Sequence, residues 1–322
     1  MPGHGDPDAR PPGIPSQNEA GRIRLPGGLA PVEPGELLVI VGETASGKTR
    51  LAVELSRAFD GEIVGADSVQ VYRGFDVGSG KPTEEELAGV RHHLIDVAEP
   101  GEDFDAARFV ELADAAIADV RARGRTPIVC GGTYLWVRAL LHGLASAPRA
   151  PKELRAKLQA DAERLGAPAL HARLAAMDPT SAARLHPNDA VRIVRALEVF
   201  ETTGRPLSEW QREHGFRPER YRARQVAIAH PRAELEARIE RRVHDMLARG
   251  WIDEVRALLA RGHGASRAMA AVGYAEVKAH LEGATAEADL AKTITRATRI
   301  FARRQRTWLA KAPVEWISAS AP

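Results

Sequence analysis

The chain has 322 residues, of which 44% are hydrophobic and 27% charged, and its net charge at pH 7 is +2. These values are ordinary for a soluble globular protein with one or two cores, and the apolar runs fall short of the ~18 residues that span a bilayer, so no membrane segment is expected. The single cysteine, Cys130, excludes an internal disulfide framework and a Cys-rich zinc site, and it favours a cytoplasmic protein.

Residues 1–35 contain 8 Pro and 7 Gly and show no apolar periodicity. Such a composition buries too little surface to offset chain entropy, so we expect a disordered leader. It has no apolar segment of the secretory type.

From residue 36, short apolar runs alternate with longer helical segments. Predicted strands cover 36–41, 62–66, 93–97, 127–131, 225–229 and 314–318. Their hydrophobicity is continuous rather than alternating, which predicts a parallel sheet covered by helices on both faces. We expect helices over 49–59 and from Phe104 to Arg123, the second with Asp103 as its N-cap. The fold class is therefore α/β.

The alternation of strands and helices stops over residues 148–224, which read as consecutive helices behind the proline-bearing stretch "SAPRAP". A strand pattern resumes at residue 225. We therefore predict an all-helical insertion that divides one α/β core into a first part, 36–147, and a second part, 225–322.

The stretch "GETASGKT" fits the P-loop pattern G-x-x-x-x-G-K-[ST] at every fixed position, between a predicted strand and a predicted helix. Backbone N–H groups and the helix N-terminus can hold phosphate oxygens. Lys48 adds a mobile cation, and the Thr49 hydroxyl can hold Mg²⁺. The predicted phosphate site consists of Gly42, Glu43, Thr44, Ala45, Ser46, Gly47, Lys48 and Thr49. This motif does not identify the molecule that carries the phosphates, and a kinase or ATPase stays open.

Two further segments end predicted strands at the same edge of the sheet, where α/β proteins bind ligands. Asp67 follows the second strand and could ligate Mg²⁺, accept a proton or only cap a helical turn. Asp96 is the rival carboxylate. Gly131 and Gly132 precede Thr133 in a glycine turn, which we take as functional rather than merely tight. The lysine turn "GSGKP" at 78–82 is a weaker signal.

A basic helix is predicted over 294–311, with six basic and no acidic residues between Arg296 and Lys311. At ~100° per residue, one stripe is expected to pack against the protein and the opposite line to face a polyanion, although a merely solvated line stays possible. The packing stripe comprises Ile294, Ala297, Phe301 and Trp308, and the basic line comprises Arg296, Arg299, Arg303 and Arg306.

Other predicted helices also carry paired arginines. Arg192 and Arg195 lie in the insertion, whereas Arg238 and Arg242 follow the fifth strand at i, i+4 spacing. One of the second pair could reach the phosphate site, and a surface salt bridge is the alternative. His186 has no companion at metal-ligand spacing.

Together these segments resemble the tRNA dimethylallyltransferases, also called tRNA isopentenyltransferases, of the bacterial type without a zinc finger. The resemblance covers roughly residues 36–318. It rests on "GETASGKT", "DSVQVYRGFDVGSGKP", "HHLID", "GGTYLWVRALL", "HPNDAVRIVRALEV", "AVGYAEV" and "ARRQRTWL", in that order.

The resemblance implies transfer of a dimethylallyl group from dimethylallyl diphosphate to the adenine next to the anticodon. The P-loop and Mg²⁺ would then hold a diphosphate leaving group, helped by Arg242, and no nucleotide would serve as fuel. Asp67 matches the family's catalytic carboxylate, and Thr133 matches a position beside the reacting base. The alternatives are an ATP-dependent kinase, which releases ADP, and a non-catalytic RNA-binding module.

The resemblance also implies contacts with the tRNA anticodon stem-loop, from which the target base must be extruded. We expect a monomer. The implied contact residues are Asp67, Ser68, Val69, Gln70, Thr133, Arg155, Arg192, Arg195, Gly273, Tyr274, Arg299, Arg303, Arg304 and Gln305.

The sequence departs from the family pattern at several positions. Glu43 stands where the family usually has proline, and we expect its side chain to point outward. "GSGKP" replaces the usual "GTAKP". Ala270 and Ala310 occupy positions that are often basic in the family.

Overall fold

The computed structural model describes residues 32–33, 35–215 and 219–318. The leader predicted over 1–35 thus lies almost wholly outside the described residues. The chain divides into two compact units, one formed by 1–141 with 221–322 and the other by 142–220. Both boundaries fall earlier in the chain than the predicted insertion limits of 148 and 224.

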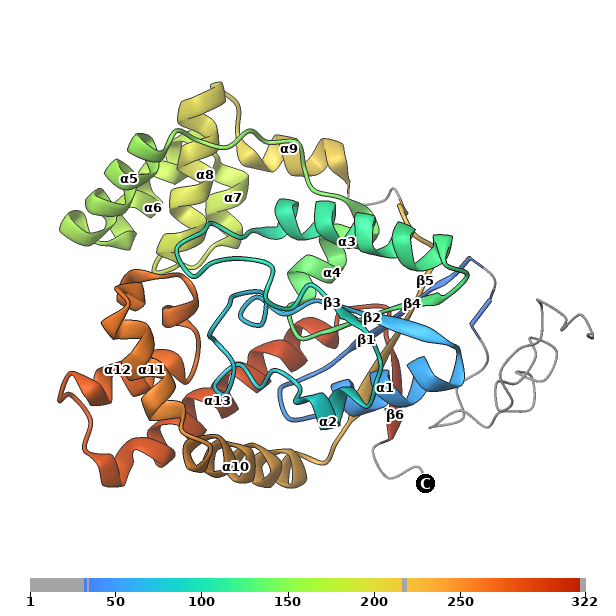
Figure 1. Ribbon diagram of the computed structural model, residues 1–322. Helices are drawn as coiled ribbons and strands as arrows, with labels where there is room; N and C mark the ends of the chain where they lie inside the picture. Colours follow the sequence, from blue (N-terminus) through green and yellow to red (C-terminus); the bar gives the residue numbers. More distant parts are fainter. Residues whose placement is uncertain (1–31, 34, 216–218, 319–322) are drawn as a thin grey trace, which may run out of the picture. The chain divides into compact units, whose positions relative to one another are not determined.

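A parallel sheet organises the first unit (Figure 1). Every neighbouring pair of its strands is parallel, in the order β3-β2-β4-β1-β5-β6, which confirms the predicted fold class. The strands are β1 (Leu37–Val41), β2 (Gly61–Gly65), β3 (His92–His93), β4 (Thr126–Gly131), β5 (Ala223–Ala229) and β6 (Glu315–Ser318).

The prediction of a strand over 93–97 is wrong beyond its first residue. Leu94 and Asp96 have positive φ angles of 64° and 56°. An extended strand cannot contain such residues, so the chain leaves the sheet after His93. The run "HLIDV" therefore bends away from the sheet, and of its residues only Leu94 is buried.

Strand β1 explains the continuous apolar pattern. Leu37, Val39 and Val41 point into one hydrophobic core, whereas Leu38 and Ile40 point into another on the opposite face of the sheet. All five side chains are at most 2% exposed. A strand covered on both faces has no solvent side on which to place polar residues.

Helix α1 contributes to the core on one face of the sheet, and the other helices of this unit pack mainly on the opposite face. These elements are α1 (Lys48–Ala58), α2 (Glu84–Leu87), α3 (Ala106–Ala122), α4 (Tyr134–His142), α10 (Arg232–Ala248), α11 (Trp251–Ala260), α12 (Tyr274–Leu281) and α13 (Glu287–Leu309), with short 3₁₀ turns at His263–Ala265 and Ala268–Ala270.

The helix predicted from Phe104 starts two residues later. Asp105, not Asp103, caps α3, because its carboxylate accepts hydrogen bonds from the N–H groups of Ala107 and Arg108, both at 3.0 Å. An aspartate at this position satisfies donors that have no partner inside the helix.

The unit of residues 142–220 is all-helical in its described part. Its helices are α5 (Lys152–Leu165), α6 (Ala167–Met177), α7 (Pro179–Arg184), α8 (Ala190–Thr203) and α9 (Leu207–His214). They enclose a separate core that includes Leu158, Leu174 and Ile193, each 0% exposed.

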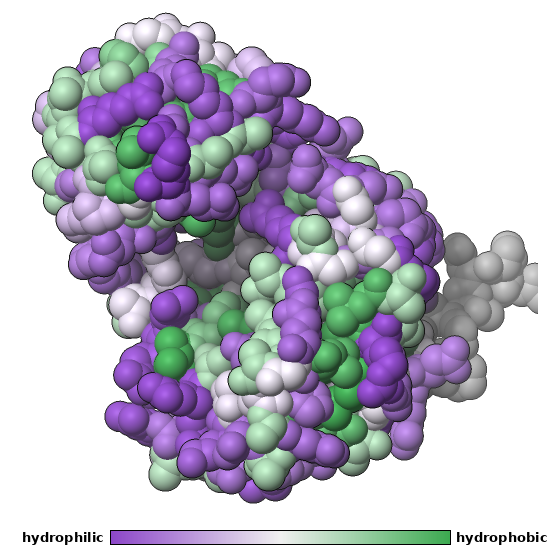
Figure 2. Space-filling view, turned by 90° about the vertical axis from the view of Figure 1, so that its left-hand side faces the viewer, coloured by the Kyte–Doolittle hydropathy of each residue, from purple (hydrophilic) through white to green (hydrophobic). Residues whose placement is uncertain are grey.

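No helix among the described residues is both long and apolar enough to cross a membrane. On the face drawn in Figure 2, hydrophilic side chains cover most of the surface, and apolar residues are confined to smaller areas between them.

Candidate active site

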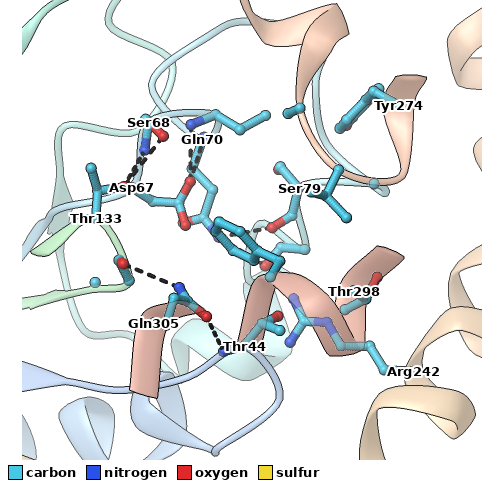
Figure 3. A pocket seen from close by; sticks show the side chains of 18 of the residues that line it. Thr44, Asp67, Ser68, Gln70, Ser79, Thr133, Arg242, Tyr274, Thr298 and Gln305 are labelled. Carbon is cyan, nitrogen blue, oxygen red and sulfur yellow. Dashed lines mark hydrogen bonds between the residues drawn. The ribbon is translucent and has the colours of Figure 1, made fainter. Parts of the chain in front are cut away.

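A cavity of about 410 Å³ lies in the first unit, at the carboxyl ends of the parallel strands (Figure 3). The P-loop follows β1, the Asp67 turn follows β2 and the Gly131–Thr133 turn follows β4, and all three segments line it. Helices α10 and α13 complete the wall. The structure therefore brings together the three segments that the sequence placed at one sheet edge.

The P-loop adopts backbone conformations that its fixed glycines permit. Gly47 has a φ of 90° directly before α1 begins at Lys48. A residue with a side chain rarely adopts this angle, which is why glycine is required there. The N-terminus of α1 and its N–H groups thus lie beside the cavity, where they favour an anion.

Two cations share this cavity. Lys48 Nζ has only one long contact in the described structure, 3.5 Å to the Glu43 carbonyl, and Arg242 makes no hydrogen bond or ion pair within the described residues. The Arg242 guanidinium lies against Gly80, where a β-carbon would be 1.9 Å from Nη2. Burial lowers the pKa of both groups. Asp67 acts on both cations electrostatically, but neither cation forms an ion pair within the described residues, so the cavity is suited to a polyanion such as a diphosphate.

Asp67 caps the turn, which is one of the alternatives that the sequence left open, and it also lines the cavity. Its Oδ1 accepts hydrogen bonds from the N–H groups of Val69 at 2.9 Å and Gln70 at 3.3 Å, and so it caps the turn. Its Oδ2 accepts none within the described chain, and the residue lines the cavity. One carboxylate oxygen is therefore held in place while the other is available to a ligand.

The rival carboxylate has a structural partner. Lys81 Nζ lies 2.5 Å from Asp96 and 2.6 Å from Asp76, and it also donates to the Tyr72 carbonyl at 2.7 Å. Neither Asp96 nor Lys81 lines the cavity. The lysine of "GSGKP" therefore stabilises a buried turn and does not reach the phosphate site.

The glycine turn after β4 is both tight and part of the cavity wall. A β-carbon on Gly131 would lie 2.1 Å from the Ala66 carbonyl oxygen, so only glycine fits. Thr133 Oγ1 accepts from the Ser68 N–H at 3.1 Å and lies 3.3 Å from the Ser68 hydroxyl. Gln70 donates to the carbonyls of Ser79 and Gly80 at 3.2 and 3.1 Å. These bonds hold the Asp67 turn against its neighbours.

Part of the wall is apolar, and its residues Met246 and Trp251 were not predicted from the sequence, whereas Gly273 and Tyr274 were named only as tRNA contacts. Met246 and Trp251 line it together with Tyr274, whose ring is 1% exposed and whose hydroxyl donates to Glu254 at 2.7 Å. Gly273, with a φ of 91°, lets Trp251 approach, since a β-carbon there would lie 2.1 Å from the indole. No local sequence pattern identifies such residues, because their alignment depends on how α11 and α12 pack.

The predicted packing stripe of α13 is wrong at its aromatic residues. Phe301 is 39% exposed and lines the cavity, and Trp308 is 50% exposed. The buried side of α13 instead contains Leu290, Ile294, Ala302 and Leu309. Thr298, Phe301, Arg304 and Gln305 share the face that borders the cavity. Phe301 suggested a core where the helix in fact borders the cavity.

The basic line of α13 also differs from the expectation. Arg299 donates to Glu240 at 2.9 Å, and Arg306 donates to the His230 carbonyl at 3.0 Å, so the protein itself engages both. Arg296 and Arg303 are exposed and have no such partner among the described residues, and the same holds for Arg304 beside the cavity.

The three arginines of the all-helical unit that were predicted to contact tRNA are each ion-paired. Arg155 makes two hydrogen bonds to the buried Glu198, at 2.6 and 3.1 Å, and Arg195 lies 3.4 Å from the same carboxylate. Arg192 lies 3.3 Å from Asp189. His186 accepts from the Asn188 N–H at 3.2 Å, which fits a role in the turn.

The donor set at the P-loop fits Mg²⁺ better than metals that prefer His or Cys. The Thr49 hydroxyl borders the cavity, and the described residues contain no cluster of three or more His, Cys, Asp or Glu suited to a metal. Magnesium commonly takes one or two protein ligands and completes its shell with phosphate oxygens and water.

The sheet, the P-loop and the cation-lined cavity define an α/β protein with a cavity suited to a phosphorylated ligand beside a carboxylate. Residues 70–312 match a family model described as IPP transferase. The chain is 58% identical to the tRNA dimethylallyltransferase of Sorangium cellulosum, over 90% of this chain and 92% of that one. It therefore belongs to the tRNA dimethylallyltransferase family, as its motifs predicted.

Solved structures agree with this assignment. The tRNA isopentenylpyrophosphate transferase of Bacillus halodurans superposes with a TM-score of 0.66 at 38% identity, covering 88% of this chain and 90% of that one. A eukaryotic dimethylallyltransferase, captured while acting on tRNA, gives a TM-score of 0.74 at 26% identity, covering 88% and 74% of the two chains. These relatives are not small-molecule kinases, and the kinase alternative is set aside.

Proposed function

We propose that the protein transfers a dimethylallyl group from dimethylallyl diphosphate to the amino group of the adenine next to the anticodon in tRNA, and releases diphosphate. One observation carries the proposal. The cavity combines two buried cations that form no ion pair within the described residues, Lys48 and Arg242, with a carboxylate oxygen of Asp67 that has no hydrogen-bond donor in the described chain. Such a site suits an anionic leaving group and a proton released nearby.

In this reaction the adenine amino nitrogen attacks the first carbon of the donor while the carbon–oxygen bond to diphosphate breaks. Negative charge accumulates on the departing diphosphate, where Lys48, Arg242 and the N–H groups of the P-loop stabilise it. The Oδ2 atom of Asp67 accepts the proton that the amino group loses. Thr133 keeps the Asp67 turn in place through Ser68.

Mg²⁺ would be held by the Thr49 hydroxyl and by diphosphate oxygens, and it would neutralise part of the leaving-group charge. The apolar residues of the wall, including Met246, Trp251 and Phe301, are suited to the five-carbon group. By excluding water they would protect an allylic cation from hydrolysis.

For the RNA, we propose contacts with the phosphate backbone through Arg303 and Arg304 and with the extruded base through residues Asp67 to Gln70 and Thr133. Arg155, Arg192 and Arg195 remain candidates for contacts in the helical unit. Their side chains are 50%, 57% and 34% exposed although each is ion-paired. Tyr274 is buried, so the segment Gly273–Tyr274 offers RNA little side-chain surface.

The proposed reaction is tested by supplying tRNA, Mg²⁺ and dimethylallyl diphosphate with all nucleotides removed. We expect one diphosphate for each adenine alkylated, detected by mass analysis of the tRNA nucleosides. A strict requirement for ATP hydrolysis, or ADP as a product, would contradict the proposal.

A second prediction separates the arginines of α13 by their partners. Arg303→Ala should weaken tRNA binding and flatten its dependence on salt by about one unit of log–log slope, since one phosphate contact is lost. Arg299→Ala is the matched control on the same helix, because Glu240 already engages that guanidinium, and its slope should change less. Equal slopes in the parent protein and the Arg303 variant, with folding intact, would mean that this face is only solvated.

A further inference from the structure

Glu43 is a buried carboxylate inside the P-loop. Its side chain is 2% exposed and does not line the cavity, so the expectation that it points outward is wrong. Its Oε2 accepts no hydrogen bond, and the nearest cation is Arg306, whose Nε lies 3.5 Å away. Burial raises the pKa of Glu43, while Arg306 and His230 act to lower it. A buried carboxylate is costly without a counter-charge, which identifies Arg306 as its partner.

Arg306 also links this carboxylate to a second support of the P-loop. It donates to the His230 carbonyl at 3.0 Å, and the His230 ring donates from Nε2 to the Ser46 carbonyl at 2.8 Å. Arg238 of α10 donates to the Ala45 carbonyl at 2.8 Å. Groups outside the P-loop thus hold Ala45 and Ser46 by their backbone carbonyls and Glu43 by its side chain.

The residue next to Arg306 reaches the opposite side of the same loop. Gln305 Oε1 accepts from the Thr44 N–H at 2.9 Å, and Gln305 Nε2 donates to the Gly132 carbonyl at 3.1 Å (Figure 3). Gln305 of α13 therefore contacts Thr44, and both residues line the cavity. Arg306 contacts Glu43, and neither of these two lines it. Both contacts join the C-terminal part of α13 to the P-loop.

We propose that Glu43 is a positioning residue, whose ion pair with Arg306 fixes the C-terminal part of α13 against the P-loop and thereby sets Gln305 between Thr44 and Gly132. The kinetic test of this role rests on the proposed function, because it measures prenyl transfer. The unfolding and exchange tests do not. Proline, which is usual at this position in the family pattern, has no charge with which to form such a pair. The ion pair connects the helix that carries Arg303 and Arg304 to the loop that holds the donor.

The pairing itself is tested by thermal unfolding, without any activity measurement. Arg306→Gln leaves Glu43 buried without a partner and should lower the melting temperature more than Glu43→Gln, which leaves a half-exposed arginine that water can solvate. Adding Glu43→Gln to Arg306→Gln should therefore restore part of the lost stability. Additive losses in the double variant would overturn the pairing.

Positioning is tested by kinetics and hydrogen exchange. Glu43→Gln should lower kcat/KM for tRNA by about 10-fold through misplacement of α13, while KM for the donor changes less than about twofold. Backbone amides in the last turns of α13 should exchange faster. Glu54→Gln is the control, since it removes an exposed carboxylate of α1 that pairs with Arg50.

The outcomes distinguish this inference from the proposed function. A parent protein that forms no prenylated tRNA contradicts the function, and exchange in α13 then still decides whether Glu43 positions the helix. An active parent with unchanged exchange and unchanged tRNA kinetics in Glu43→Gln overturns the positioning role. A loss of donor affinity as large as the loss for tRNA would overturn it as well.

Discussion

Asp67→Asn is expected to lower the turnover of prenyl transfer by about 10²–10⁴-fold, the range typical for loss of a general base. The asparagine carbonyl can still accept the N–H groups of Val69 and Gln70, so the turn should keep its shape. The side-chain amide cannot take a proton at neutral pH. Single-turnover kinetics measure the loss, and tRNA binding should change little by comparison.

Asp96→Asn is the informative control for this variant. Asp96 is held by Lys81 outside the cavity, so its loss should reduce stability without removing the chemical step. Turnover per folded molecule should then stay near that of the parent protein. If Asp67→Asn turns over as fast as the parent, or if only Asp96→Asn is inactive when folded, the assignment of the base is wrong.

The residues of this site that could be placed from the sequence are those that belong to short, local patterns. The P-loop spacing fixes which residues surround the phosphates, because a strand, a glycine-rich turn and a helix N-terminus follow one another within a few residues. Asp67 and Thr133 could be placed because each directly follows a buried strand, and parallel strands end at one edge. The family resemblance then supplied the roles that geometry leaves open.

The predictions that were wrong concern residues whose partners are distant in the chain. Nothing near Arg306 in the sequence indicates that Glu43 is its counter-charge, and Glu240 lies 59 positions from Arg299. A helical wheel assigned Phe301 to the core since it considers only one helix. In the structure that face borders a cavity, where an apolar side chain can serve a ligand. Positive φ angles at Leu94 and Asp96 likewise end a strand that composition favours.

Lys48→Ala is expected to lower turnover by about 10²–10³-fold, comparable to removal of one donor from an oxyanion hole. The ammonium group stabilises charge that grows as diphosphate departs, so the variant should lose more in kcat than in donor affinity. Burial lowers the pKa of Lys48 in the free protein, whereas a bound diphosphate favours its charged form. Donor binding should therefore weaken as pH rises through that lowered pKa, and this weakening should disappear in Lys48→Ala.

Arg242 lines the same cavity, and its alanine variant provides a comparison for Lys48→Ala. Its guanidinium stays charged over the accessible pH range, so Arg242→Ala should weaken donor binding while keeping the pH dependence that Lys48 provides. Isothermal titration with diphosphate, across pH and for both variants, separates the two cations. If the pH dependence survives in Lys48→Ala, a group other than this lysine titrates on donor binding. If donor affinity falls as much as turnover does, Lys48 binds the ground state and not the departing diphosphate.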